Sequence, residues 1–100
     1  METEIYLIGK FYETDDIGQQ IETETKRPVF ANIESVGQNE FFKAGKNGLR
    51  PSFKCIIWDF EYDNEDEIEF NGEIYCIYRT FIRSDEHIEL YVEMRTKKWA

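Results

Sequence analysis

Apolar and polar residues alternate along most of this 100-residue chain, and the alternation is interrupted once, between residues 35 and 51. A period of two residues is typical of half-buried β-strands. Inside the interruption, SVGQNEFFKAGKNGLRP, the spacing becomes helical and places Phe41 and Ala44 on one face. The sequence therefore predicts a β-domain that contains one short α-helix, at about residues 38–47.

Both ends of this helix have recognisable signals. Asn39 is a candidate N-cap, because its side chain can accept a hydrogen bond from the first turn. Gly48 is well placed to end the helix, whereas Gly45 weakens its interior. A helix this short needs tertiary packing, so we expect Phe41 to pack inward.

The first half of the chain predicts two long strands joined by a turn. Residues 4–12 alternate, TDDIG at residues 14–18 has the composition of a turn, and residues 20–36 form the second predicted strand. Residues 17–26 offer few core side chains, so we expect this part of the hairpin to be an extended, exposed arm. Pro28 cannot donate to a ladder and indicates an edge or a bulge.

Further strands are predicted at residues 52–62, 67–70, 73–83 and 87–95, and Asn71-Gly72 is a strong hairpin signal. The last strand alternates most clearly. Its inward residues are expected to be Ile88, Leu90, Val92 and Met94, and its outward ones His87, Glu89, Tyr91 and Glu93. Residues 96–100 are expected to form a loose tail.

Five or six antiparallel strands of this length predict an all-β fold, a small barrel or sandwich with the inserted helix and the hairpin arm. One hundred residues allow a single domain, residues 1–100. The strands at residues 52–62 and 74–82 are apolar on both faces. Either a partner covers the second face, or a tightly curled barrel and its helix cover it.

The formal net charge is −9, and eight acidic residues and no basic one lie between Asp59 and Glu73. This balance argues against a general nucleic-acid binder and against anchoring on an anionic membrane. The first residues, METEIYLIGKFYE, have neither the charge nor the apolar length of a signal peptide. Cys55 and Cys76 are therefore expected to be free thiols of a reduced protein.

No catalytic or metal motif is convincing. Ser84, Asp85 and His87 are too close in sequence to face one another productively. A calcium loop that starts at Asp59 lacks the glycine at its sixth position and the glutamate at its twelfth. We therefore expect no enzymatic activity, no cofactor and no metal site.

A basic and aromatic group surrounds the predicted helix: Phe41, Phe42, Lys43, Lys46 and Arg50. It is too small beside so much acid for a convincing nucleic-acid patch. The bases are either solvated helix charges or salt-bridge partners for an acidic neighbouring subunit.

The order of these features resembles the head-closure proteins of long-tailed bacteriophages, also called head–tail adaptor, stopper or minor head-completion proteins. The resemblance runs from about Ile5 to Glu93. It depends on the order of several weak pieces, carried by Val36-Gly37, Glu40-Phe41, Ala44, Gly48-Leu49, Pro51 and, separately, Arg79-Thr80 in IYRTF.

The resemblance implies a non-catalytic structural protein of the virion, made in the host cytoplasm, with a small β-barrel, a short helix and a long extended loop. Subunits of this kind form a ring on the portal or adaptor proteins, close the DNA exit channel and offer a docking surface to the tail-completion protein. DNA passes nearby without sequence-specific binding. Phe41, Phe42, Lys43, Lys46 and Arg50 are then candidate interface residues. Candidate channel-facing acids are Asp59, Glu61, Asp63, Glu65, Asp66 and Glu67.

A second hypothesis stays open. The acidic run could imitate DNA phosphates, which would make the protein a DNA mimic or regulator that inhibits a DNA-binding enzyme. A mimic has no need of the helical segment at residues 35–51, whereas an assembly module uses it.

Overall fold

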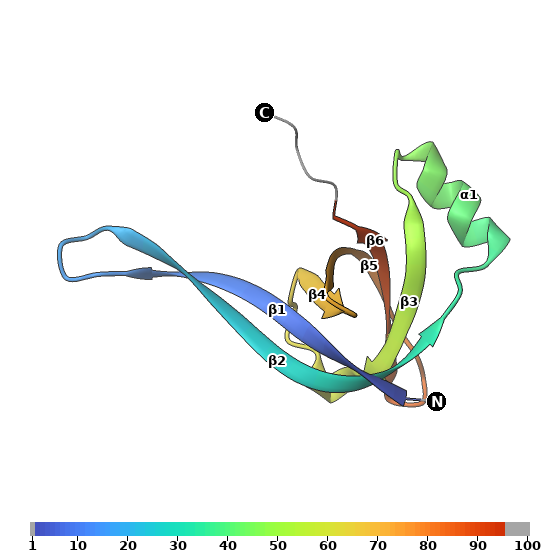
Figure 1. The fold of residues 1–100 in the computed structure, drawn as a ribbon, viewed down its shortest axis with the longest axis horizontal. Coiled ribbons are helices and arrows are strands. Elements are labelled where there is room, and N and C mark those ends of the chain that lie inside the picture. Colours follow the sequence, from blue (N-terminus) through green and yellow to red (C-terminus); the bar gives the residue numbers. More distant parts are fainter. Residues whose placement is uncertain (1, 96–100) are drawn as a thin grey trace.

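A computed structural model describes residues 2–95 and shows a closed antiparallel barrel of six strands, in the order β1-β2-β3-β6-β5-β4 (Figure 1). The predicted all-β barrel with one short helix is confirmed. The expected tail at residues 96–100 lies outside the described residues. The elements are β1 (Glu2–Thr14), β2 (Gln20–Glu34), α1 (Gln38–Lys46), β3 (Pro51–Trp58), the 3-10 turn η1 (Asp59–Glu61), β4 (Glu67–Phe70), β5 (Glu73–Ile82) and β6 (His87–Met94).

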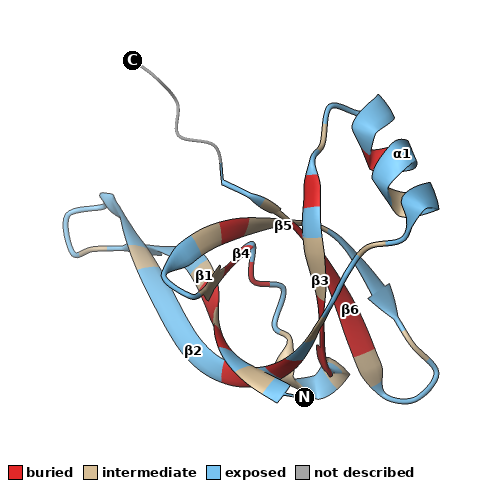
Figure 2. Ribbon diagram, turned by 45° about the vertical axis from the view of Figure 1, so that its right-hand side comes forward, coloured by how far each residue is buried: buried red, intermediate tan, exposed pale blue. Residues whose placement is uncertain are grey.

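Alternating residues of the six strands fill the barrel interior, and Figure 2 shows buried residues along the strands that form the wall. A barrel this small is filled by its own side chains. Phe53 meets the rings of Phe70 and Tyr75 edge to face, at centroid distances of 5.4 Å and 4.7 Å. The buried cluster consists of Ile5, Leu7, Val29, Ala31, Cys55, Ile57, Ile68, Tyr75, Ile88, Leu90 and Val92.

The β1–β2 hairpin is longer than the barrel. Its register runs from Glu2 opposite Asn32 to Thr14 opposite Gln20, but β4 pairs only with residues 6–8 of β1 and β3 only with residues 32–34 of β2. Residues 9–25 therefore form a two-stranded arm that projects from the barrel (Figure 1). This confirms the predicted extended hairpin and places Pro28 in a stretch of β2 that pairs with β1 alone.

Two turns follow their sequence signals. At the end of the arm, the Asp15 side chain accepts hydrogen bonds from the amides of Ile17 and Gln19, at 3.0 Å and 2.8 Å. Between β4 and β5, Asn71 and Gly72 both have positive φ, at 52° and 81°. That pair of conformations is the one a tight hairpin requires, so the Asn-Gly prediction is confirmed.

Three details of the prediction were wrong. The strand expected to reach residue 62 ends at Trp58, where the chain turns into η1. The N-cap of α1 is Gly37, and no side chain caps the helix, so Asn39 does not cap it. In β6, Met94 is exposed, because it lies at the strand end beyond the closed core, while the outward Glu89 and Tyr91 are buried.

Candidate functional site

The helix α1 lies on the outside of the barrel wall (Figure 2). Ala44 is its only buried residue. After the helix, the amide of Leu49 donates to the carbonyl of Ala44, and that of Gly48 to Gly45, each at 3.0 Å. With Gly48 at φ 78°, these two bonds form a Schellman motif, which confirms that Gly48 ends the helix. We call residues 38–50 the helix platform.

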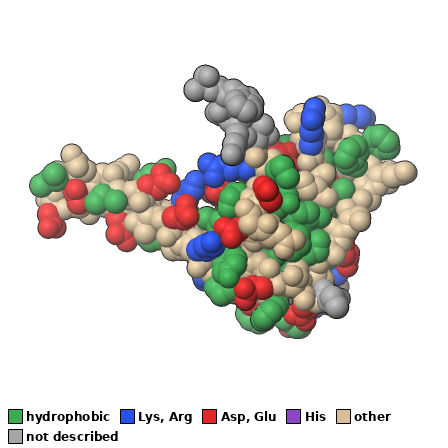
Figure 3. Space-filling view, in the orientation of Figure 1, with side chains coloured by type: hydrophobic (Ala, Val, Ile, Leu, Met, Phe, Trp, Pro, Cys, Tyr) green, Lys and Arg blue, Asp and Glu red, His purple; other side chains and the backbone are tan. Residues whose placement is uncertain are grey.

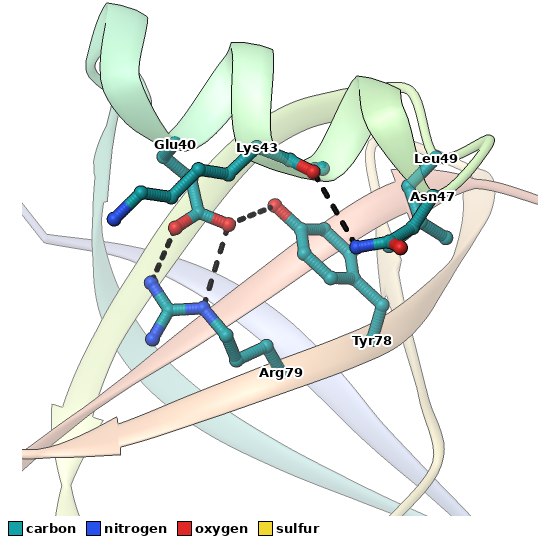
Figure 4. Close-up of a pocket in the computed structure, with 7 residues that line it drawn as sticks. Glu40, Lys43, Asn47, Leu49, Tyr78 and Arg79 are labelled. Carbon is teal, nitrogen blue, oxygen red and sulfur yellow. Dashed lines mark hydrogen bonds and ion pairs between the residues drawn. The ribbon is translucent and has the colours of Figure 1, made fainter.

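Polar contacts, rather than apolar packing, fasten the platform to β5 (Figure 4). Arg79 donates to Glu40 Oε1 from Nη2 at 2.5 Å and to Oε2 from Nε at 3.4 Å. Tyr78 Oη donates to Glu40 Oε2 at 2.9 Å. Burial opposes ionisation of Glu40, but the hydrogen bonds from Arg79 and Tyr78 keep its pKa below the usual value. Glu40 is therefore an ionised carboxylate whose oxygens both accept hydrogen bonds within the subunit.

A hollow of about 460 Å³ lies beside this contact, between α1 and β5. Its lining carries no nucleophile with a neighbouring base, and its carboxylate is the one that Arg79 holds. Figure 4 shows Glu40 directed from the helix to Tyr78 and Arg79 on the strand. The hollow is therefore the space left between the helix and the strand on which it packs. It is lined by Glu40, Lys43, Ala44, Asn47, Leu49, Tyr78 and Arg79.

The polar contacts continue across the outer side of β6. The guanidinium of Arg79 stacks on the Tyr91 ring, 4.0 Å from its centroid, and Tyr91 Oη donates to Glu89 at 2.6 Å. Arg83 and Lys54 also meet Glu89, at 2.6 Å and 3.5 Å. This network buries the two outward residues of β6. On this strand the chain covers its own second face, whereas Phe81 and Ile82 on β5 stay exposed.

Phe41 does not pack into the core. It is 50% exposed and meets Phe42, itself 64% exposed, edge to face at 6.2 Å. The reason is that Glu40 and Ala44, four residues apart, share the side of α1 that meets the barrel. Phe41 follows Glu40 and lies off that side of the helix. The rings of Phe41 and Phe42 are therefore accessible to another molecule.

The basic residues of the helix platform differ from the other lysines and arginines of the described chain. Within residues 2–95, Lys43, Lys46 and Arg50 take part in no ion pair, whereas every other lysine and arginine there does. Figure 3 shows basic side chains above α1 with hydrophobic ones beside them. The five residues named from sequence as interface candidates are therefore all exposed, and all belong to the helix platform.

The six acids named as channel-facing divide into two groups. Asp59, Glu61, Asp63 and Asp66 have no ion-pair partner among the described residues. Glu65 and Glu67 do not face solvent, being 5% and 9% exposed, because basic side chains cover both of them. Glu67 lies between Lys10 and Arg95, at 3.6 Å and 3.4 Å.

Glu65 organises the loop that contains these acids. It pairs with Arg27 of β2 at 2.5 Å and accepts the amide of Asp63 at 2.7 Å. Arg27 also donates to the carbonyl of Glu61 at 2.7 Å. A Cβ on Gly9 would lie 3.2 Å from Glu65, so the glycine lets the loop approach the base of the arm. The sequence does not predict this cluster, because no local pattern connects residues 27 and 65.

An aromatic surface that the sequence did not single out lies where β3 ends and β6 begins. Trp58 stacks on His87 at 4.1 Å and on Phe60 at 6.0 Å. His87 Nδ1 is 3.3 Å from Asp85, and no hydrogen bond joins Ser84 to His87 among the described residues. Residues 2–95 also contain no group of three side chains that suits a metal ion.

A scan of the sequence against protein-family models gave no match, and a search of curated proteins gave no significant one. In the described part of the chain, no helix has the length and apolar character needed to cross a membrane. The function is therefore inferred from the surfaces above.

Proposed function

We propose that this protein is a structural component of the virion of a tailed bacteriophage or prophage. In this role its copies form a ring at the head–tail connector, close the DNA exit channel of the capsid and offer a docking surface to the tail. It is made in the bacterial cytoplasm, contacts portal or adaptor proteins and the tail-completion protein, and performs no catalysis.

The observation that carries the proposal is the placement of two different surfaces without internal ion pairs in the described chain, the acidic part of the arm and the basic side of the helix platform, on opposite sides of one closed barrel (Figure 1). The arm projects on one side, and the helix platform lies on the other (Figure 1). Closed rings of identical subunits need this arrangement, because each contact joins two different patches.

A second observation supports the same family. The two sequence signatures of the resemblance, one around Glu40 and the other at Arg79, are 39 residues apart and meet in an ion pair. Residues that hold a helix platform on its barrel are the ones a shared assembly module would keep together.

The acids without partners fit passage of DNA. Asp59, Glu61, Asp63 and Asp66 carry net negative charge in one loop, and such a surface repels phosphate instead of binding it. Glu65 and Glu67 have no part in this surface, because their charges are neutralised inside the subunit.

Imaging tests the proposal directly. Purified protein is mixed with a portal–adaptor complex and examined by electron microscopy, and the expected result is a ring of added density below the adaptor. Absence of added density at saturating protein would overturn the proposal. The matched control is the double variant Phe41→Ala with Phe42→Ala, which keeps the barrel core and removes both exposed rings of the platform.

The alternative is a DNA mimic that inhibits a DNA-binding enzyme. The loop acids favour it, since they are unpaired and close in sequence. Salt-sensitive inhibition of such an enzyme at low protein concentration, abolished by Asp59→Asn with Asp63→Asn, would establish the mimic and not the ring component.

A further inference from the structure

The arm is built for contact with another molecule. Residues 11–25 contain five acids and no base: Glu13, Asp15, Asp16, Glu22 and Glu24. None of these acids takes part in an ion pair within the described residues. Large apolar side chains also stay exposed there, with Ile17 at 78%, followed by Tyr12, Ile21 and Phe11. An isolated two-stranded ribbon with these residues gains nothing from them unless something covers it.

The helix platform is complementary to the arm in both respects. It carries the three unpaired bases Lys43, Lys46 and Arg50, and it exposes the rings of Phe41 and Phe42. Its one acid, Glu40, is already held by Arg79. Acids with apolar side chains on the arm therefore match bases with aromatic side chains on the helix platform.

The two surfaces cannot meet within one subunit. The molecule measures 50 × 36 × 24 Å, and the arm extends along the longest axis away from the side that bears α1 (Figures 1 and 3). Figure 3 shows acidic and hydrophobic side chains along the arm and basic ones above the helix. A copy of the same chain, displaced along this axis, brings an arm to a platform.

We propose that the arm of one copy docks across the helix platform of the next copy, with Ile17 near Phe42 and with Asp16 and Glu22 facing Lys43 and Lys46. The contact is head to tail, so its repetition closes a ring when the rotation from one copy to the next divides a full turn, and gives an open filament otherwise. This inference rests on the proposed ring function and names the contact that builds the ring.

The acidic loop at residues 59–66 is the other acidic surface that could meet a platform. It is less suited, because Arg27 and Glu65 hold it against the base of its own arm. It follows the barrel wall, so two barrels would need to approach wall to wall. The arm reaches a neighbour without that constraint. The loop therefore serves as the control surface in the experiments below.

Cysteine cross-linking tests the contact. In a Cys76→Ser background, Ile17→Cys and Phe42→Cys are made on separate chains of different mass, mixed and oxidised, both free and on the portal–adaptor complex. Buried Cys55, whose pKa burial raises to about 12, stays unreactive. We expect a mixed dimer, and a ladder of higher species when one chain carries both substitutions. Phe60→Cys, on the acidic loop and also well exposed, is the matched control for Phe42→Cys.

Charge reversal provides a second, independent test of the contact. Two double variants are made: one reverses the charge of the platform (Lys43→Glu with Lys46→Glu), and the other reverses the charge of the arm (Asp16→Lys with Glu22→Lys). Each is expected to weaken self-association at least about tenfold at low salt. Asp15 is left intact because it holds the turn. Mixing the two reversed proteins restores association, since every arm then meets a platform of opposite charge. Reversal at Asp59 and Asp63 has no such effect.

The outcomes separate this contact from the proposed function. A cross-link without ring density on the portal complex keeps the contact and overturns the function. Ring density without the cross-link, or with an Ile17→Cys to Phe60→Cys link in its place, overturns the contact and keeps the function. Arm-to-arm dimers alone, or failure of the reversed pair to restore association, also overturn the contact.

Discussion

The barrel wall and the arm are both acidic, but they treat their carboxylates in opposite ways. In the wall, and in the helix and loop that are fastened to it, Glu40, Glu65 and Glu89 each have a basic partner from another element and are largely shielded from water. Along the arm, five acids have no ion-pair partner in residues 2–95. The difference teaches that the paired acids complete the subunit, whereas the acids of the arm, like those of the loop at residues 59–66 that have no partner among the described residues, contribute nothing to its internal ion pairs.

Core truncation gives the largest contrast between the two regions. Leu90→Ala removes a fully buried side chain of β6 and should lower the free energy of unfolding by about 2–5 kcal/mol. Ile17→Ala, on the arm, should change it by less than about 0.5 kcal/mol. Urea unfolding followed by tryptophan fluorescence measures both. Equal losses of unfolding free energy in the two variants would mean that the arm unfolds as part of the core, which would contradict the contrast between the two regions.

The fold should lose more stability when a buried acid loses its basic partner than when an exposed base without an ion pair is removed. Arg27→Met leaves the carboxylate of Glu65 buried without its cation, at a cost of about 1–3 kcal/mol. Arg50→Met, an equivalent change at an exposed arginine without an ion pair, should cost under about 0.5 kcal/mol. Denaturation midpoints of the two variants provide the comparison, and a larger loss for Arg50→Met would contradict it.

A fall in pH should lower the free energy of unfolding through the carboxylates of Glu40 and Glu89. Burial opposes ionisation of Glu40 and Glu89, yet hydrogen bonds from Arg79 and Tyr78, and from Tyr91 and Arg83, hold both pKa values below 4.5. A folded pKa below the unfolded one stabilises the fold fully above pH 4.5, and that stability is lost as the pH falls through the folded pKa.

The measurement is the urea midpoint between neutral pH and about pH 3, where free glutamates protonate. The double variant Glu40→Gln with Glu89→Gln should show a shallower decline on acidification than the parent protein. An unchanged slope would show that these two groups do not link stability to pH.

The smallest effect concerns the fastening of the helix. Glu40→Gln weakens the contact with Arg79 and should loosen α1 by about 1 kcal/mol, or roughly fivefold faster hydrogen exchange of its amides. Amides of β6 should not change. Lys46→Gln is the control on the same helix, because that lysine is exposed and has no ion pair in the described part. Faster exchange across the whole barrel would show that the helix and the wall open together.

Much of the fold could be predicted because its signals are local. Alternation located the strands, Asn71-Gly72 set one hairpin, and Gly48 ended the helix. The scarcity of core residues near the first turn identified the arm. The strand after the helix was predicted too long, because apolar content does not distinguish its last residues from η1.

The candidate site could be predicted only in part. Alternation shows which way a side chain points but not what covers it, so it does not predict the burial of Glu89 and Tyr91. Their cover consists of bases from β3 and β5 that the sheet register brings alongside. The spacing of Phe41 and Ala44 predicts that Phe41 points inward, but Glu40, which Arg79 holds, occupies that side of the helix.

The closed barrel has a consequence for polymerisation. Closure removes free strand edges from the wall, so in the described chain the arm is where unpaired backbone edges concentrate. Such edges invite strand addition between copies and the growth of fibres. Two arms that approached edge to edge would bring like charges together along their whole length, since residues 11–25 carry five acids and no base. The acidic composition of the arm therefore opposes aggregation of the protein through its exposed strand edges.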